Sequence, residues 1–378
     1  MALGVYVHVP FCIRKCLYCS FTSYPVNREL TETYLTALAR EINMYGSALS
    51  HTERAVSSVF VGGGTPSCLP VAGLKAIFDQ LGSSFLFLPG CEITVEVNPG
   101  TVDDVYLNGL LEAGVNRLSI GVQSLQDHLL DELGRIHKAG QALDAVNLAR
   151  KAGFRNLNLD FIFGIPGQTG AAWAATLGGA LALAPEHVSV YGLQIEENTP
   201  LARAVASGQT TPCPEELELG MYLAAIDSLT QNGYEHYEIS NFARPGRQCA
   251  HNLVYWQNRP YLGLGPAAHS FFRGERFANE TSVARYSQKL CREEYPVETR
   301  EKITPETEMA ETMFLGLRLL QGVDLNMFYH RFGRRAEVVY RREIAGLVKE
   351  GLVEFAGERL RLTARGLPLA NRVFGEFV

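Results

Sequence analysis

Short runs of β-branched and aromatic residues alternate with longer amphipathic stretches through the first two thirds of the chain. Most of the short runs are followed by a polar or glycine-containing turn and then by a helical pattern. The strand candidates are GVYVHV, AVSSVFV, EITVEV, RLSIGV, NLNLDFIF and HVSVYGL, and helix candidates include TETYLTALAREINMY, VAGLKAIFDQL and QALDAVNLARKA. This succession predicts an α/β fold with a parallel sheet and right-handed crossovers, arranged as a closed barrel, a partly open barrel or a doubly wound sheet.

Residues with unusual chemistry or conformation come directly after these predicted strands. In chain order they are the cysteines at 12–19, the GGGTP segment at 62–66, EVNP at 96–99, Gln123, Asp160 with GIP at 164–166, and Gln194. In a barrel the carboxyl ends of all parallel strands point to one face, where active sites are built. The pattern therefore favours a barrel whose functional residues meet at one rim.

The βα rhythm stops near residue 245, and we expect three regions. They are a barrel over 1–245, a loop-rich segment with the sequence HNLVYW over 246–299, and a helical, winged-helix-like domain over 300–378 that ends in GLVEFAGERLRLT. Winged-helix domains often bind DNA. Here, however, the arginines at 334, 335, 341 and 342 are interspersed with glutamates, which is typical of a solvated helix face.

Composition narrows the class of protein. The chain has 47% hydrophobic and 20% charged residues and no apolar run long enough to cross a bilayer, which predicts a globular protein without a membrane span. The net charge of -6 argues against general nucleic-acid binding. Because the start MALGVYVHVPFC lacks the features of a secretory signal, we expect a cytoplasmic protein. Disulfides are rare there, so a tight cysteine cluster favours metal or redox chemistry.

The segment PFCIRKCLYCSF places Cys12, Cys16 and Cys19 in the spacing CxxxCxxC, while the other five cysteines are scattered. A structural zinc site would need a fourth protein ligand, and none of the nearby candidates completes a second pair. A 4Fe-4S cluster can instead be held through three of its irons, which leaves the fourth iron open to a cofactor or substrate. Three cysteines therefore predict an open 4Fe-4S cluster.

With these motifs the whole chain resembles the radical S-adenosylmethionine (SAM) enzymes, and within them the HemN/HemW branch. The resemblance rests on Tyr6 before the cysteines, Tyr18, GGGTP, Glu96, GVQS at 121–124, GRIH at 134–137 and DFIFGIPGQ at 160–168. It implies a partial (β/α)6 barrel with a C-terminal winged-helix-like domain. It also implies that the open iron binds the amino and carboxylate groups of SAM, and that reductive cleavage gives methionine and a 5′-deoxyadenosyl radical. The SAM contacts that it implies are Tyr6, Tyr18, Gly63, Gly64, Thr65, Glu96, Gln123, Arg135 and Asp160.

These residue types suit the chemistry, although each also has a simpler reading. The glycine run lets backbone approach a ligand closely, but a triple glycine is more often a tight turn. Glu96 and Asp160 can accept hydrogen bonds from an ammonium or a ribose hydroxyl, whereas an isolated acid at a strand end is usually solvated. Arg135 offers a planar fork for a carboxylate, and Tyr18 offers a ring for adenine, but both residue types also serve surface or packing roles.

Two features separate members of this branch. The coproporphyrinogen dehydrogenase pattern continues to CxxxCxxCxC, and its last position is Phe21 here; this chain also begins only five residues before Tyr6. HNLVYW, from His251 to Trp256, resembles the HNxxYW signature of the branch members that act as heme chaperones. A heme site needs an imidazole for iron and aromatic surface for the macrocycle. His251 is therefore the candidate heme ligand, with Cys249 and His269 as alternatives; without the family, the segment predicts a loop packed onto a core.

Two functions from different classes follow from the resemblance. The favoured one is a carrier that binds heme and passes it to apo-hemoproteins of the respiratory chain, with a 4Fe-4S cluster and SAM as cofactors. The other is an oxidoreductase that acts on a porphyrinogen, so whether the protein is an enzyme stays open. We expect heme and apo-hemoproteins as partners and no nucleic acid; peripheral membrane association and a homodimer are left open. A zinc-stabilised barrel would not explain why the other motifs gather at strand ends.

Overall fold

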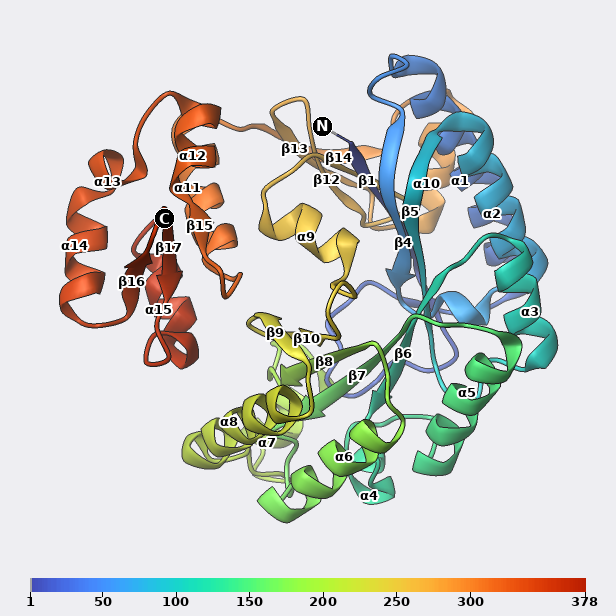
Figure 1. The fold of residues 1–378 in the computed structure, drawn as a ribbon. Coiled ribbons are helices and arrows are strands. Elements are labelled where there is room, and N and C mark those ends of the chain that lie inside the picture. The colour runs from blue at the N-terminus through green and yellow to red at the C-terminus, as the bar shows by residue number, and fades with distance from the viewer. Residues whose placement is uncertain (1) are drawn as a thin grey trace.

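The computed structural model describes residues 2–378, and its central feature is a twelve-stranded sheet. Six neighbouring strands of that sheet run parallel, each paired with the next. They are β1 (Leu3–Val9), β4 (Ala55–Gly63), β5 (Leu86–Val97), β6 (Arg117–Gln123), β7 (Leu157–Phe163) and β8 (His187–Gly192). These strands confirm the six predicted from the hydrophobic pattern, and they curve into an arc (Figure 1).

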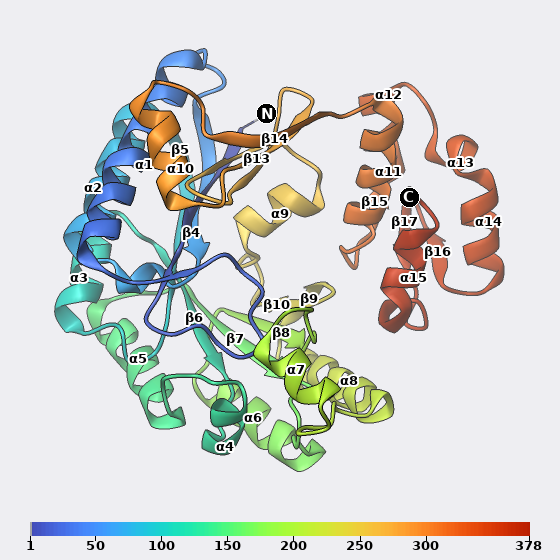
Figure 2. The ribbon, with the colours of Figure 1, turned by 180° about the vertical axis from the view of Figure 1, so that it is seen from behind.

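Helices cover the outer face of the arc (Figures 1 and 2). They are α1 (Arg28–Ala48), α2 (Val71–Ser84), α3 (Asp104–Glu112), α4 (Asp127–Glu132), α5 (Ala139–Ala152), α6 (Gly170–Ala182), α7 (Pro200–Ala206) and α8 (Glu215–Gln231). Their ends follow local sequence signals, since the Asn27 side chain caps the start of α1 and Gly153, with φ of 114°, ends α5. Across residues 2–378, no helix is both long enough and apolar enough to cross a membrane.

The barrel is partial because β1 and β8 do not pair with each other. On one side β1 pairs with β11 (Tyr261–Leu264), and on the other β8 pairs with β10 (Asn241–Ala243), which is followed in the sheet by β9 (Glu235–Glu238). Helix α9 (Ala250–Trp256), which has the sequence AHNLVYW, lies between these two sides (Figure 1). The HNLVYW segment is therefore part of the wall that encloses the barrel interior.

The segment 246–299, which we expected to be rich in loops, folds mainly into regular structure. After α9 and β11 it contains β12 (His269–Phe272), β13 (Glu275–Asn279), α10 (Val283–Cys291) and the start of β14 (Val297–Lys302). These strands extend the barrel sheet on the β1 side. Runs of only four to six residues carry little periodicity, which is why the pattern was not visible in the sequence. The three domain boundaries stay a prediction.

The C-terminal region packs five helices and a small sheet beside the barrel (Figure 2). It contains α11 (Pro305–Gly316), β15 (Val323–Asp324), α12 (Leu325–Phe332), α13 (Ala336–Val339), α14 (Arg341–Lys349), β16 (Val353–Ala356), β17 (Arg359–Leu362) and α15 (Ala370–Gly375). Strands β16 and β17 form the expected wing, and β15 completes their sheet. The Arg318 guanidinium lies 4.3 Å from the Trp256 ring centroid, so the last residue of α9 contacts this region.

One buried carboxylate joins the first helix to the sheet extension. Glu41 of α1 is fully buried and accepts hydrogen bonds from the Gly265 amide (2.7 Å), the Asn279 side chain (2.7 Å) and the Tyr286 hydroxyl (2.5 Å). Its partners lie after β11, at the end of β13 and in α10. Glu41 therefore holds together elements that are more than two hundred residues apart in sequence.

We predict that Glu41→Ala lowers the free energy of unfolding by about 2–4 kcal/mol, because several buried donors lose their acceptor. Urea denaturation followed by circular dichroism measures the change. Glu32→Ala is the matched control on the same helix; its ion pair with Arg28 is exposed, so its loss should leave the free energy of unfolding almost unchanged. Equal effects of the two substitutions would contradict the role assigned to Glu41.

Candidate functional site

The cysteine-bearing loop lies at the carboxyl end of β1. Cys12 ends the short strand β2 (Phe11–Cys12), which pairs with β3 (Tyr24–Pro25), and Cys16 and Cys19 follow in the loop between them. All three side chains are partly exposed and none forms a disulfide. The Arg14 side chain donates to the carbonyl groups of Gly134 and Arg135, both at 2.9 Å, and fastens the loop to the rim of the barrel.

An outer cavity of about 510 Å³ opens between this loop and the strand ends. Every predicted cluster and SAM residue except Tyr6 lines it, together with neighbours from the same rim. The predicted residues in its wall are Cys12, Cys16, Tyr18, Cys19, Gly63, Gly64, Thr65, Glu96, Gln123, Arg135 and Asp160. The fold thus brings together positions that the sequence spreads over about 150 residues.

Two side chains donate hydrogen bonds to cysteine sulfurs. The Thr65 hydroxyl lies 3.6 Å from Cys12 Sγ, and Arg135 Nη1 lies 3.5 Å from Cys16 Sγ. Arg135 is itself buried, and its Nη2 donates to Asn98 Oδ1 at 2.7 Å and to the Gly121 carbonyl at 2.8 Å. Donors and a positive charge of this kind stabilise thiolate sulfur and tune iron–sulfur clusters.

The cysteines fit a cluster better than a single ion. Within residues 2–378 no three His, Cys, Asp or Glu side chains are arranged around one point as ligands of a single metal ion. In a cubane cluster each cysteine binds a different iron, so its ligands are spread more widely. Their convergence on one cavity, with donors directed at two of the sulfurs, is compatible with that geometry.

Glycine is required where the second strand meets the cysteine loop. Gly63 has φ of +106°, and a Cβ atom there would lie 2.5 Å from the His8 ring. A Cβ at Gly64 would lie 2.5 Å from the Phe11 carbonyl oxygen. The close approach lets the Thr65 amide bond to that carbonyl at 2.7 Å, which locks the glycine run to the loop.

Two partly buried acids line both the outer cavity and the inner one beside it. Glu96 accepts a hydrogen bond from the Gly63 amide at 3.1 Å, and Asp160 accepts from Ser119 at 3.0 Å and Asn158 at 2.8 Å. Burial, and the nearby Asp160, raise the pKa of Glu96 to about 8, and burial also raises the pKa of Asp160. Desolvated carboxyl groups with raised pKa values are typical of ligand-binding sites.

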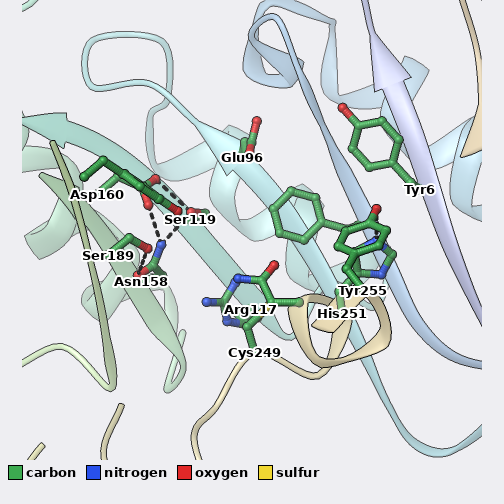
Figure 3. A pocket seen from close by; sticks show the side chains of 13 residues that line it. Tyr6, Glu96, Arg117, Ser119, Asn158, Asp160, Ser189, Cys249, His251 and Tyr255 are labelled. Carbon is green, nitrogen blue, oxygen red and sulfur yellow. Dashed lines mark hydrogen bonds between the residues drawn. The ribbon is translucent and has the colours of Figure 1, made fainter. Parts of the chain in front are cut away.

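A smaller, inner cavity of about 190 Å³ adjoins the outer one, and Figure 3 shows the side chains that line it. The two cavities share four wall residues, Glu96, Ser119, Asp160 and Tyr191. Tyr6 faces the inner cavity, and its hydroxyl bonds to His8 Nδ1 at 3.0 Å. The SAM contact predicted at Tyr6 therefore lines the inner cavity and not the outer cavity that holds the cysteines.

The three heme-ligand candidates have different surroundings. His251 is 1% exposed, and its Nδ1 and Nε2 atoms bond to Ser58 (3.0 Å) and Tyr255 (2.9 Å); burial lowers its pKa to about 3. Cys249 is fully buried, and burial raises its thiol pKa to about 12. His269 lies on β12 and is exposed to solvent. Only His269 among the three is open to an incoming ligand in this conformation.

The sequence did not single out some residues of the two cavities. The Asn98 side chain accepts a hydrogen bond from Arg135, and the Ser119 hydroxyl donates one to Asp160. Arg117 is buried and lines the inner cavity. Asn98 belongs to the EVNP strand end and could have been found by its position. Arg117 is a charged residue at the start of an apolar strand, and a charge at such a position is itself a signal of a functional role.

Comparisons with known proteins agree with this geometry. The Radical SAM superfamily matches residues 6–178, and the HemN C-terminal domain matches residues 303–369. The chain is 35% identical to the heme chaperone HemW of Bacillus subtilis, with 99% of each chain covered. It is 31% identical to the heme chaperone HemW of Escherichia coli, with 100% of this chain and 98% of that protein covered.

Among solved structures, coproporphyrinogen III oxidase (HemN) from Escherichia coli, described as a radical SAM enzyme, superimposes with a TM-score of 0.86 at 25% identity. The match covers 100% of this chain and 90% of that one, so it includes both the barrel and the C-terminal region. Together with the full-length similarity to the chaperones, it shows that this chain belongs to the HemW family within the radical SAM superfamily.

Proposed function

We propose that this protein is a heme chaperone that binds heme and transfers it to apo-hemoproteins, and that it carries a 4Fe-4S cluster and binds SAM. Full-length similarity to proteins named as heme chaperones supports the carrier function. The observation that carries the proposal is the single cavity that gathers the cysteines, the glycine run and the two acids. We propose apo-hemoproteins of the respiratory chain as recipients; cytoplasmic location, membrane-surface association and a homodimer are further proposals.

Different residues of the outer cavity would bind the cluster and SAM. Cys12, Cys16 and Cys19 would hold three irons, and the open iron of such a cluster binds the amino and carboxylate groups of SAM. The glycine run keeps backbone close to the cysteine loop, as its contacts require. Glu96 and Asp160 would accept hydrogen bonds from the polar groups of SAM, and Tyr18 would offer a ring to its adenine.

The carrier is favoured over a catalyst by the end of the cysteine motif. Phe21 stands where the dehydrogenase pattern has a further cysteine, and it lies at the rim of the outer cavity with 61% of its surface exposed. An exposed aromatic ring at a cavity mouth suits contact with a flat hydrophobic ligand. The alternative, an oxidoreductase acting on a porphyrinogen, is supported by the structural match to coproporphyrinogen III oxidase.

The heme ligand is proposed among the histidines. His251 stays a candidate, but it must first give up its bonds to Ser58 and Tyr255, and the inner cavity of about 190 Å³ is smaller than most ligand pockets. His269 is exposed on β12, and β12 pairs with β11, the strand that lies next to β1 in the sheet. These surroundings favour His269 as the iron ligand.

We predict that alanine at Cys12, Cys16 or Cys19 abolishes the cluster, because an open-iron site has no spare ligand. After anaerobic reconstitution, iron content should fall from about four per chain to background in each variant. Cys91→Ala, a cysteine buried on β5 away from the cavity, is the control and should keep its iron. Full iron content in Cys16→Ala, or zinc in the wild-type protein, would disprove the cluster assignment.

SAM binding should weaken in Glu96→Gln and Asp160→Asn while iron content is unchanged. Loss of a charge-assisted hydrogen bond in Asp160→Asn costs about 1.5–3 kcal/mol, which corresponds to a roughly 10- to 150-fold rise in Kd measured by equilibrium dialysis. Glu96 is mainly uncharged at neutral pH, so Glu96→Gln should lose a neutral hydrogen bond of about 0.5–1.5 kcal/mol, a roughly 2- to 10-fold rise. Glu132→Gln, whose carboxylate pairs with Thr210 outside the cavity, is a matched control. Loss of iron in the two site variants would instead give these acids a structural role.

The reconstituted protein should bind heme at near-stoichiometric occupancy and fail to convert coproporphyrinogen III when SAM and a low-potential reductant are supplied. Absorption spectroscopy measures the heme, and product analysis measures turnover. His269→Ala should shift the heme bands because an axial ligand sets the electronic environment of iron. His251→Ala is the comparison variant. If the heme bands shift in His251→Ala but not in His269→Ala, His251 is the iron ligand. Many turnovers of coproporphyrinogen III would overturn the carrier function.

A further inference from the structure

A buried arginine in the inner cavity has few partners. Arg117 is the first residue of β6, and it is 1% exposed. Its Nη1 atom lies 3.5 Å from the Thr94 hydroxyl, at the limit of a hydrogen bond. Within residues 2–378 its Nε atom has no hydrogen-bond partner, and the nearest carboxylate oxygen, of Glu92, is 3.9 Å away. Figure 3 shows the guanidinium between the cluster around Asp160 and the side chains of α9.

Such an arrangement is costly unless something else satisfies the guanidinium. The interior of a barrel is normally filled by apolar side chains, and a buried guanidinium whose carboxylate partner lies beyond hydrogen-bond distance is stabilised less than a well-paired one. The Glu92 carboxylate does not hydrogen-bond to Arg117. It accepts hydrogen bonds at the start of α9 instead, from the Ala250 and His251 amides, each at 3.1 Å. Arg117 therefore keeps unused hydrogen-bonding capacity that faces a cavity.

The HNLVYW helix brings further donors to the same cavity. Asn252 and Tyr255 both line it, and within residues 2–378 the Asn252 side chain makes no hydrogen bond. His251 holds the Tyr255 hydroxyl at 2.9 Å and Ser58 at 3.0 Å. When Ser58 donates to Nδ1, the Nε2 hydrogen of His251 points to the Tyr255 oxygen. The Tyr255 hydroxyl hydrogen is then available to a ligand.

We propose that Arg117, Asn252 and Tyr255 form a binding site for a carboxylate carried on a short alkyl arm. A guanidinium fork matches a carboxylate in shape and charge, and an amide and a hydroxyl add neutral donors. A cavity of about 190 Å³ has the volume of roughly six water molecules, which is enough for a propionate-sized group. Phe60 and Tyr6 in its wall supply the apolar surface for the alkyl part.

The acids in the wall do not prevent binding of an anion. Burial and the nearby Asp160 raise the pKa of Glu96 to about 8, so Glu96 is mainly uncharged at neutral pH. Asp160 has its own donors in Ser119 and Asn158. The wall shared with the outer cavity lets an arm enter from a ligand there. On the proposed function, that arm is a propionate of heme; a free short-chain carboxylate has the same chemistry.

The first experiment tests the subsite with propionate alone and does not depend on heme. Propionate should raise the melting temperature of the wild-type protein by about 2 °C or more at saturation, and propionamide should not. Arg117→Met should remove the difference between the two compounds. Arg150→Met, which breaks an ion pair with Glu186 outside the barrel, should keep it. Equal responses of wild-type protein to propionate and propionamide would overturn the subsite.

The second experiment compares heme with heme dimethyl ester, in which both propionates are blocked. The wild-type protein should bind heme at least about tenfold more tightly than the ester, and Arg117→Met should bind the two alike. A wild-type protein that shows the propionate effect but binds no heme would identify a free carboxylate as the ligand and reject the proposed function. A wild-type protein that binds heme and its ester equally, without a propionate effect, would reject the subsite alone.

A substitution at a buried arginine can prevent folding, which iron content and circular dichroism would reveal. In that case both experiments are repeated with Asn252→Leu, because Asn252 is partly exposed. It should weaken the preference for propionate over propionamide and for heme over its ester by at least about threefold. Unchanged preferences in Asn252→Leu would overturn the subsite as drawn.

Discussion

The cost of burying charge inside an incomplete barrel is the constraint on which the rest of the structure depends. Most barrels fill their interior with apolar side chains, but Glu96, Asp160 and Arg117 keep this one polar and partly open. Each acid is stabilised by donors from neighbouring strands, because an unsatisfied buried carboxyl group would cost several kcal/mol. The two connected cavities are the result, and any ligand that enters them meets preoriented polar groups rather than water.

Helix α9 completes this interior where the sheet leaves it open. Its start is held by the Glu92 carboxylate, which joins it to β5, and its His251 side chain bonds to Ser58 on β4. At its other end Trp256 lies under Arg318, whose guanidinium also pairs with Glu238 at 3.5 Å. One short helix thus links the barrel interior to the C-terminal region. A ligand that moves α9 would therefore also change its contacts with that region.

Much of the fold and of the outer cavity could be predicted because the signals are local. The six parallel strands appear as β-branched runs. The rule that active residues follow barrel strands predicts that the cysteines, Glu96 and Asp160 lie at one rim, as they do in the structure. The strands between residues 261 and 279 escaped prediction because each is too short to show a period. A functional role for Arg117 was not predicted because the apolar residues next to it in RLSIGV are typical of an ordinary buried strand.

The sequence by itself determined the cysteine spacing, the strand order along the chain and the glycine run, since these depend on neighbours within a few residues. Only the tertiary structure decided what surrounds each side chain. It buried His251 between Ser58 and Tyr255, left His269 exposed, and left Arg117 short of partners in a cavity. Such burial and pairing arise from contacts between strands and helices far apart in the chain, and no local pattern encodes them.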